Sequence, residues 1–166
     1  MGGPFEAAMG SVLADLRKEF KRASRTMMRD LAEDAWSAAW RKFGTYTGNP
    51  SWPQLAPFTQ ADREAQGFTP NDPLLRTGDL RESVMRRHGI RWAEVGTDDP
   101  VMIYHELGTW RMPPRPVFGP VVTQQAEQFR NLIDLNMRSI LEKHRMSYSV
   151  EASQTQGFTQ AEPING

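Results

Sequence analysis

The distribution of proline constrains the fold of this chain more than any other feature of its sequence. Ten of the twelve prolines fall between Pro50 and Pro120, whereas residues 5–49 and 121–162 contain none. Proline lacks a backbone N–H and its ring clashes with the preceding turn, so it interrupts the interior of a helix. The sequence therefore predicts long helices in the two flanks, with loops, turns and short elements between them.

The N-terminal flank is predicted to form one long amphipathic helix over residues 4–43. Pro4 is a favourable first helical residue, and Gly44 is a favourable stop. Apolar residues recur every three or four positions, at Leu13, Leu16, Phe20, Ala23, Met27, Leu31, Ala35 and Ala38. An unbroken helix of this length would extend about 60 Å, against a radius of gyration of about 15 Å for a compact domain of this size. We expect the helix to project, to bend near Gly10, or to pack on another subunit.

Two further features of this helix are candidate contacts. A second apolar edge, formed by Trp36, Trp40 and Phe43, belongs either to the core, as such stripes usually do, or to an oligomer contact. The first half is also rich in basic residues: Arg17, Lys18, Lys21, Arg22, Arg25 and Arg29. Such a run is usually a solvated face, and the alternative is a contact with DNA or with an acidic partner surface.

The middle region opens with a proline-rich segment, residues 48–57. We expect an ordered loop that Trp52 and Leu55 pin to the domain. Thr59 can then cap a short helix that Gly67 ends. Farther along, Thr77 or Asp79 can supply the side-chain oxygen that caps a single turn of helix.

A β-hairpin is predicted to follow this turn. Val84–His88 and Arg91–Val95 pair across the short connection His88-Gly89-Ile90, and Gly96 closes the second strand. Residues 101–104 and Leu107 then form one or two turns of helix, stopped by Gly108 and packed on the sheet.

Five short motifs follow one another between Trp52 and Pro120. They comprise Trp52, Leu55 and Thr59; Thr77, Gly78, Leu80 and Ser83; Val95, Gly96 and Thr97; Tyr104, His105 and Gly108; and Arg115 with Pro116. In this order they resemble the virion morphogenesis, or tail-completion, family of tailed bacteriophages. Pro114 stands where that family has a small residue before the arginine, which makes the segment stiffer.

The resemblance implies a structural virion protein, assembled in the bacterial host cytoplasm and located in the neck or tail. Such a protein forms a ring that joins the tail terminator to the head connector or stopper and leaves a channel for DNA, without sequence-specific binding. The sixfold tail implies a homohexamer, and a ring requires two different complementary faces on each subunit. Within the family the motif residues, His105 and Gly108 included, have no implied catalytic role. The alternatives are a tail terminator, a head-closure (stopper) protein or, more distantly, a nucleic-acid-binding module.

The sequence gives little indication of enzymatic activity, of a bound cofactor or of a metal site. His105-Glu106 lacks the second histidine of a zinc-protease helix, because Thr109 stands at that position, so a metal hydrolase is a remote alternative. There is no cysteine, which excludes disulfides and cysteine-ligated zinc. Twenty basic and twenty acidic residues cancel, which argues against bulk attraction to nucleic acid. No apolar run predicts a membrane span. Arg111 and Arg115 could grip a phosphate or carboxylate, or anchor a rigid extended segment.

The C-terminal flank is predicted to form a second long helix over residues 117–145, which packs beside the first helix and the hairpin. Its apolar stripe comprises Val121 or Val122, Ala126, Phe129, Leu132 or Ile133, Met137, Ile140 and Leu141. Residues 147–166 form a polar tail that is mobile in the free chain or ordered on a neighbouring subunit. The predicted fold is a single α+β domain, residues 1–146, with a small antiparallel sheet in the region 44–120 packed against two long α-helices and flanked by proline-rich loops.

Overall fold

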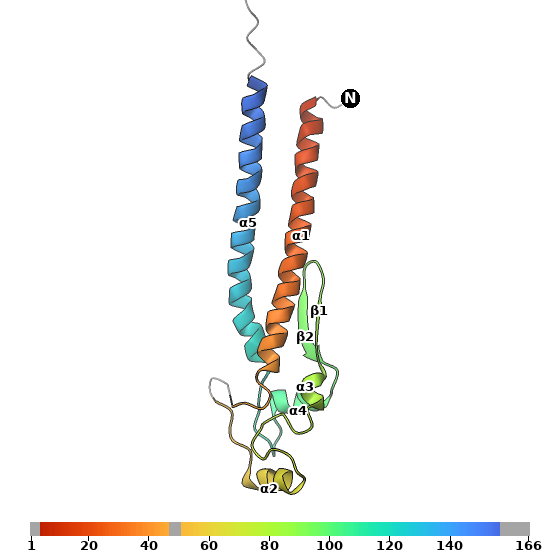
Figure 1. The fold of residues 1–166 in the computed structure, drawn as a ribbon, viewed down its shortest axis with the longest axis vertical. Coiled ribbons are helices and arrows are strands. Elements are labelled where there is room, and N and C mark those ends of the chain that lie inside the picture. Colours follow the sequence, from red (N-terminus) through yellow and green to blue (C-terminus); the bar gives the residue numbers. More distant parts are fainter. Residues whose placement is uncertain (1–3, 47–50, 157–166) are drawn as a thin grey trace, which may run out of the picture. The chain divides into compact units, whose positions relative to one another are not determined.

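The computed structural model describes residues 4–46 and 51–156, with only the backbone described at 4–5, 7–8 and 146–156. Its elements, in chain order, are α1 (Pro4–Trp40), α2 (Pro57–Ala65), α3 (Asp79–Glu82), β1 (Val84–His88), β2 (Ala93–Thr97), α4 (Val101–Leu107) and α5 (Phe118–Gln156) (Figure 1). The predicted α+β class is confirmed, because α1 and α5 pack against a two-stranded antiparallel sheet.

The chain divides into two compact units. Unit 1 comprises Met1–Ala23 and Asn131–Gly166, and unit 2 comprises Ser24–Arg130. Each long helix therefore contributes one part to each unit. The division describes how residues pack and not whether each unit folds alone, so the single domain over residues 1–146 stays a prediction.

Helix α1 runs without interruption through Gly10 and ends at Trp40, so the predicted end at residue 43 was wrong. After Trp40 the backbone tightens, since the amides of Lys42 and Phe43 donate to carbonyls three residues back. Gly44 then reverses the chain with a φ of 78°. A Cβ at Gly44 would lie 2.9 Å from Leu75 Cδ2, the mobile end of a side chain, so the positive φ is what favours glycine here.

The core of unit 2 gathers side chains from every part of its sequence. Its buried members are Ala35, Ala39, Phe43, Trp52, Leu74, Val84, Met102, Val117 and Val121. On α1 the buried positions include Met28 and Ala32, whereas the predicted stripe positions Met27 and Leu31 are only half-buried. The buried face is thus rotated by about one residue, and its alanines let the neighbouring elements approach the helix closely.

The hairpin forms with a later second strand than predicted. β1 pairs with β2 in the register Val84↔Thr97 to His88↔Ala93, so the second strand is 93–97 and not 91–95. The connection is the four-residue segment Gly89–Trp92, closed by a hydrogen bond from Gly89 N to Trp92 O at 2.8 Å. Gly96 lies within β2 and does not close it.

The flanks of two helices also differ from the predictions. α2 begins at Pro57 with Ala56 at its N-cap, so Thr59 lies inside the helix and does not cap it. Proline supplies a favourable first helical residue without a side-chain cap. Gly67, with a φ of 79°, follows the end of α2 as predicted. α5 continues to Gln156, so the predicted helix end at 145 was wrong. Within the predicted tail, residues 157–166 lie outside the described residues.

Candidate functional site

The motif residues around the start of the hairpin form a set of backbone ties in unit 2. Gly78 precedes α3 with a φ of 103°, a conformation that side-chain-bearing residues rarely adopt. Gly78 is the N-cap of α3 and no side chain caps the helix, so the predicted cap by Thr77 or Asp79 was wrong. Thr77 Oγ1 accepts a hydrogen bond of 3.4 Å from Asp79 N beside this helix start. Ser83 donates to Leu80 O at 2.8 Å, and its hydroxyl lies 2.6 Å from Thr97 Oγ1. These bonds fix the start of β1 to the end of β2.

The ties continue from the sheet into α4. Thr97 Oγ1 accepts a hydrogen bond from Asp99 N at 3.0 Å, and Asp99 Oδ1 accepts one from Val101 N at 2.9 Å, at the first residue of α4. Gly108 follows the helix with a φ of 73°, and a Cβ there would lie 2.8 Å from Pro114 N. The predicted stop at Gly108 is therefore confirmed, with a steric reason.

Glu106, which with His105 was the basis of the remote metal-hydrolase alternative, caps the N-terminus of α5. Its carboxylate accepts three backbone hydrogen bonds, from Val117 N at 2.7 Å, Phe118 N at 3.2 Å and Gly119 N at 2.7 Å. The next residue, Pro120, has no N–H to satisfy. One carboxylate thus serves all the free amides of this helix start, where the helix dipole also favours negative charge.

His105 is held in a partly buried, positively charged environment. Burial lowers the pKa of its imidazole, and the positive charges of Arg115 and Arg63 lower the pKa further, while Asp99 opposes them. Its Nδ1 atom is buried without a hydrogen-bond partner. Its backbone carbonyl accepts a hydrogen bond from Arg115 N at 2.6 Å. The neutral imidazole therefore belongs to the packing of α4 against residues 113–117.

Arg115 is a buried clip between two proline-rich segments. Its side chain is 4% exposed, and its guanidinium donates to Pro53 O at 3.0 Å and Gln54 O at 3.4 Å. Trp52, beside these carbonyls, is buried in the core of unit 2. The sequence left two hypotheses for Arg115, that it binds a phosphate or carboxylate or that it anchors an extended segment. The structure agrees with the second, because Arg115 is too buried to bind an external phosphate. Leu55 and Pro116, which belong to the same two segments, are half-buried.

Arg63 is a second buried arginine, and the sequence pattern did not predict its burial. It donates to Asp72 O at 2.6 Å and Leu75 O at 3.3 Å, and burial lowers the pKa of its guanidinium. These carbonyls flank Leu74, the one non-glycine residue with positive φ in the described part of the chain. Arg63 thereby stabilises a strained turn. No sequence signal separates it from the exposed charges of α2.

A group of large apolar side chains is exposed on α4 and in the turn after it. Ile103, Tyr104, Leu107 and Trp110 are 59%, 57%, 74% and 86% exposed. Leu107 lies on the same side of α4 as Ile103 and Tyr104, because residues three and four positions apart are neighbours on a helix surface. Met102, which faces the other way, is in the core. We call this group the α4 patch; the sequence pattern predicted only that α4 packs on the sheet.

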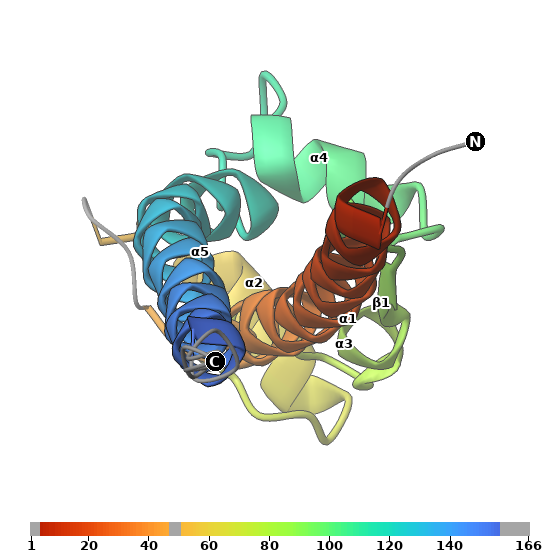
Figure 2. The same ribbon diagram turned by 90° about the horizontal axis from the view of Figure 1, so that it is seen from above.

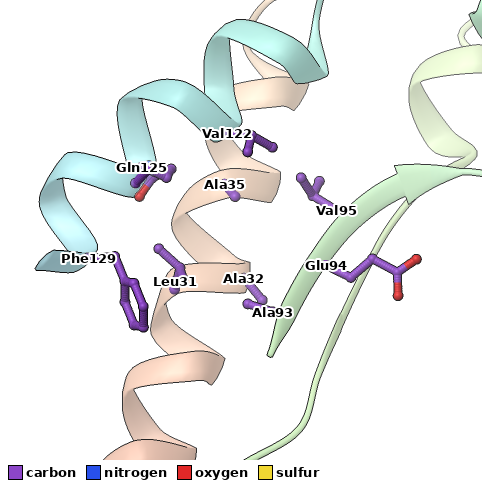
Figure 3. Close-up of a pocket in the computed structure, with 10 residues that line it drawn as sticks. Leu31, Ala32, Ala35, Ala93, Glu94, Val95, Val122, Gln125 and Phe129 are labelled. Atoms are coloured by element: carbon purple, nitrogen blue, oxygen red, sulfur yellow. The ribbon is translucent and has the colours of Figure 1, made fainter. Parts of the chain in front are cut away.

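An apolar pocket lies between α1, β2 and α5, within unit 2. Its volume is about 220 Å³, and its lining includes Leu31, Ala35, Val95, Val122 and Phe129 (Figure 3). Four of its lining residues are alanines, at 32, 35, 93 and 126, which leaves the space open. The sequence could not have located it, since its walls come from three distant segments.

Unit 1 is a pair of helical segments without a buried core. Glu19 on α1 bonds Lys143 and His144 on α5, with a distance of 3.0 Å to His144 Nε2, and the hydrogen bonds from Lys143 and then His144 lower the pKa of the Glu19 carboxyl. No described side chain of unit 1 is buried. Its exposed large apolar side chains are Met9, Leu13, Leu132, Ile133, Leu135, Met137 and Leu141.

The three residues predicted as oligomer contacts differ in burial. Phe43 is 4% exposed and belongs to the core, which contradicts its place in a contact surface. Trp36 packs partly against the core, and its indole donates to Val84 O at 2.9 Å. Trp40 remains 36% exposed, with the Arg81 guanidinium 4.1 Å from its ring centroid. Of the three, Trp40 is the one available to a partner.

The predicted basic contacts are all exposed, in both units. Arg17, Lys18, Lys21 and Arg22 lie in unit 1, and Arg25 and Arg29 lie in unit 2. Arg29 pairs with Asp30 at 2.8 Å, in an ion pair that is exposed and therefore weak. Their exposure fits a solvated face and a partner contact equally.

No family model, curated protein or solved structure matches this chain. The resemblance to the tail-completion family is therefore based on the sequence motifs alone. Within residues 4–46 and 51–156, no group of three or more His, Asp or Glu side chains could hold a metal ion. No helix in the same ranges is both long and apolar enough to cross a membrane.

Proposed function

We propose that this chain is a structural protein of a tailed bacteriophage virion, a tail-completion subunit that forms a ring at the neck or head-proximal end of the tail. The observation that carries the proposal is the helix pair of unit 1, which exposes seven large apolar side chains while none of its described side chains is buried. Most helical stability in proteins comes from packing an apolar face. These side chains lack cover in the single chain.

Other copies of the chain are the simplest cover for these side chains. Leu135 and Leu141 are 64% and 54% exposed on α5, and large exposed apolar groups of this kind mark association surfaces. The ordered motifs then select the class of assembly, because they resemble the tail-completion family. From that resemblance we expect six copies, contacts with the tail terminator and the head connector or stopper, and a channel through which DNA passes.

The scaffold role of the motif residues supports a mechanical function. Glu106 caps α5, Arg115 ties two loops, and Ser83 ties the hairpin. These are contacts that fix loop geometry and leave no free catalytic group among them. A tail terminator or a stopper would have the same features. A nucleic-acid-binding module is favoured only by the exposed basic residues of α1.

The decisive experiment inactivates the gene in the phage that carries it and examines lysates by electron microscopy. A tail-completion role predicts filled heads and complete tails that remain unjoined, with infectivity restored by a plasmid-borne copy. Tails of uncontrolled length would instead indicate a terminator, and emptied heads a stopper. Normal infectious particles without the protein would refute the proposal.

Assembly of the purified chain can be followed by mass photometry. Leu141→Gln should reduce ring formation while circular dichroism shows an intact fold, because Leu141 is exposed and contributes little to a core. The neighbouring exposed Glu142→Gln is the matched control and should assemble normally. Trp40→Ala should likewise leave a folded monomer that assembles poorly. Unfolding of the Trp40 variant would instead assign that residue to the core.

A further inference from the structure

The turn after α4 presents an aromatic side chain in a fixed position. Thr109 and Met112 form a β-bridge, with hydrogen bonds from Thr109 N to Met112 O at 2.8 Å and from Met112 N to Thr109 O at 3.2 Å. Trp110 and Arg111 therefore occupy its two-residue tip, and Pro113 and Pro114 follow directly. In Figure 2 the segment after α4 projects outward beyond that helix. A turn held in this way loses little conformational entropy when it docks.

Trp110 and Arg111 have the composition of an interface centre. Trp110 is 86% exposed, and the Arg111 guanidinium lies 4.0 Å from its ring centroid. Tryptophan, tyrosine and arginine dominate the binding energy of protein interfaces. At their exposed fractions, Tyr104 and Trp110 together would bury roughly 300 Å². A stable interface buries about 800 Å² per partner, so these two side chains can supply only part of a contact and other side chains must supply the rest.

The pocket between α1, β2 and α5 is a hollow apolar surface in the same unit. An apolar cavity of about 150 Å³ holds benzene, so the pocket of about 220 Å³ has room for the larger indole ring. Its walls are apolar, and Val122 at its edge is 57% exposed. The pocket is thus suited to one flat apolar side chain.

The charges beside the two surfaces are complementary. Glu94 lies on the β2 side of the pocket, and Figure 3 shows its carboxylate pointing away from the interior. It forms no ion pair within the described part of the chain, and Arg111 forms none there either. With Trp110 inserted, Arg111 beside it would be placed at the outside of the pocket, where Glu94 is the available acid.

We propose that Trp110 of one copy inserts into the α1, β2 and α5 pocket of the next copy, with Arg111 paired to Glu94. The two surfaces differ, so the contact is heterologous, the kind that generates a ring when its rotation closes. This inference rests on the proposed function, because it supplies the two faces that a ring subunit needs.

Disulfide trapping tests the contact directly, because the chain contains no cysteine. Arg111→Cys and Gln125→Cys chains, oxidised together, should cross-link to each other far more than either chain does alone. A single chain with both substitutions should give a ladder that ends at the closed ring. Glu64→Cys on exposed α2, paired with Gln125→Cys, is the control and should not cross-link.

Association measurements supply the second readout. Trp110→Ala should weaken self-association by about tenfold or more, whereas Phe58→Ala, which removes an aromatic side chain that is 84% exposed on α2, should not. Arg111→Glu should weaken it too, and the double variant Arg111→Glu, Glu94→Arg should recover it.

The outcomes separate this contact from the proposed function. Rings that form without the Arg111–Gln125 cross-link would overturn the contact and leave ring assembly intact. Cross-linking of Arg111→Cys chains mainly to one another would indicate a symmetric contact and also overturn it. Chains that stay monomeric at every concentration and give no cross-link would count against both.

Discussion

Removal of the Glu106 carboxylate is expected to destabilise unit 2 more than the loss of an ordinary surface glutamate. The side chain accepts hydrogen bonds from Val117 N, Phe118 N and Gly119 N. Loss of a helix N-cap costs about 0.5–2 kcal/mol, and each hydrogen bond to a charged group contributes about 1.5–3 kcal/mol. Val117 is fully buried, whereas Gly119 is exposed and can bond water instead.

The buried amide therefore decides the size of the effect. Water can replace the carboxylate at Gly119, and partly at Phe118, but an unpaired amide at Val117 keeps most of its desolvation cost. We expect Glu106→Ala to lower the free energy of unfolding by about 2–3 kcal/mol. Glu106→Gln retains one acceptor oxygen and should lose about half as much.

Urea unfolding followed by circular dichroism and tryptophan fluorescence measures this difference. Glu127→Ala, at an exposed position on the same helix, is the matched control, and it should change the stability by less than about 0.5 kcal/mol. Faster hydrogen exchange at the amides of residues 117–119 should accompany the loss in Glu106→Ala. If Glu106→Ala and Glu127→Ala lower the free energy of unfolding equally, Glu106 does not stabilise α5 as a cap.

Two further predictions concern the backbone and the pH dependence. Gly78→Val should destabilise the fold by about 1 kcal/mol or more, because φ is 103° there, whereas Gly10→Ala inside α1 should be neutral or stabilising; equal effects in thermal unfolding would remove the conformational reason. His105 has a folded-state pKa below its ordinary value of 6.5, so protonation favours the unfolded chain. Stability is then complete above about pH 6.5 and falls as the pH drops below it. His105→Asn should weaken the pH dependence of the unfolding midpoint below about pH 6.5; an unchanged pH dependence would contradict this assignment.

Local chemistry in the sequence was sufficient to predict the type of most elements. Proline placement separated the two helical flanks from the middle region, and the glycines after α2 and α4 marked helix ends because they tolerate positive φ. Boundaries were less predictable: α1 ends at Trp40 and α5 continues to Gln156. The end of α1 depends on Gly44 meeting Leu75 and Pro73, and these are contacts that no local pattern contains.

Tertiary structure alone decided what the polar and apolar side chains do. In the sequence, Glu106 next to His105 also allowed a remote catalytic interpretation. In the structure Glu106 is a helix cap, because α5 begins beside it. Phe43 entered the core although its spacing matched Trp36 and Trp40. The sequence did not predict the pocket or the exposed Trp110 turn, because the identity of an apolar residue does not show whether its side chain is buried or exposed in the fold. Secondary structure follows from residues a few positions apart, whereas burial and function depend on which distant segments meet.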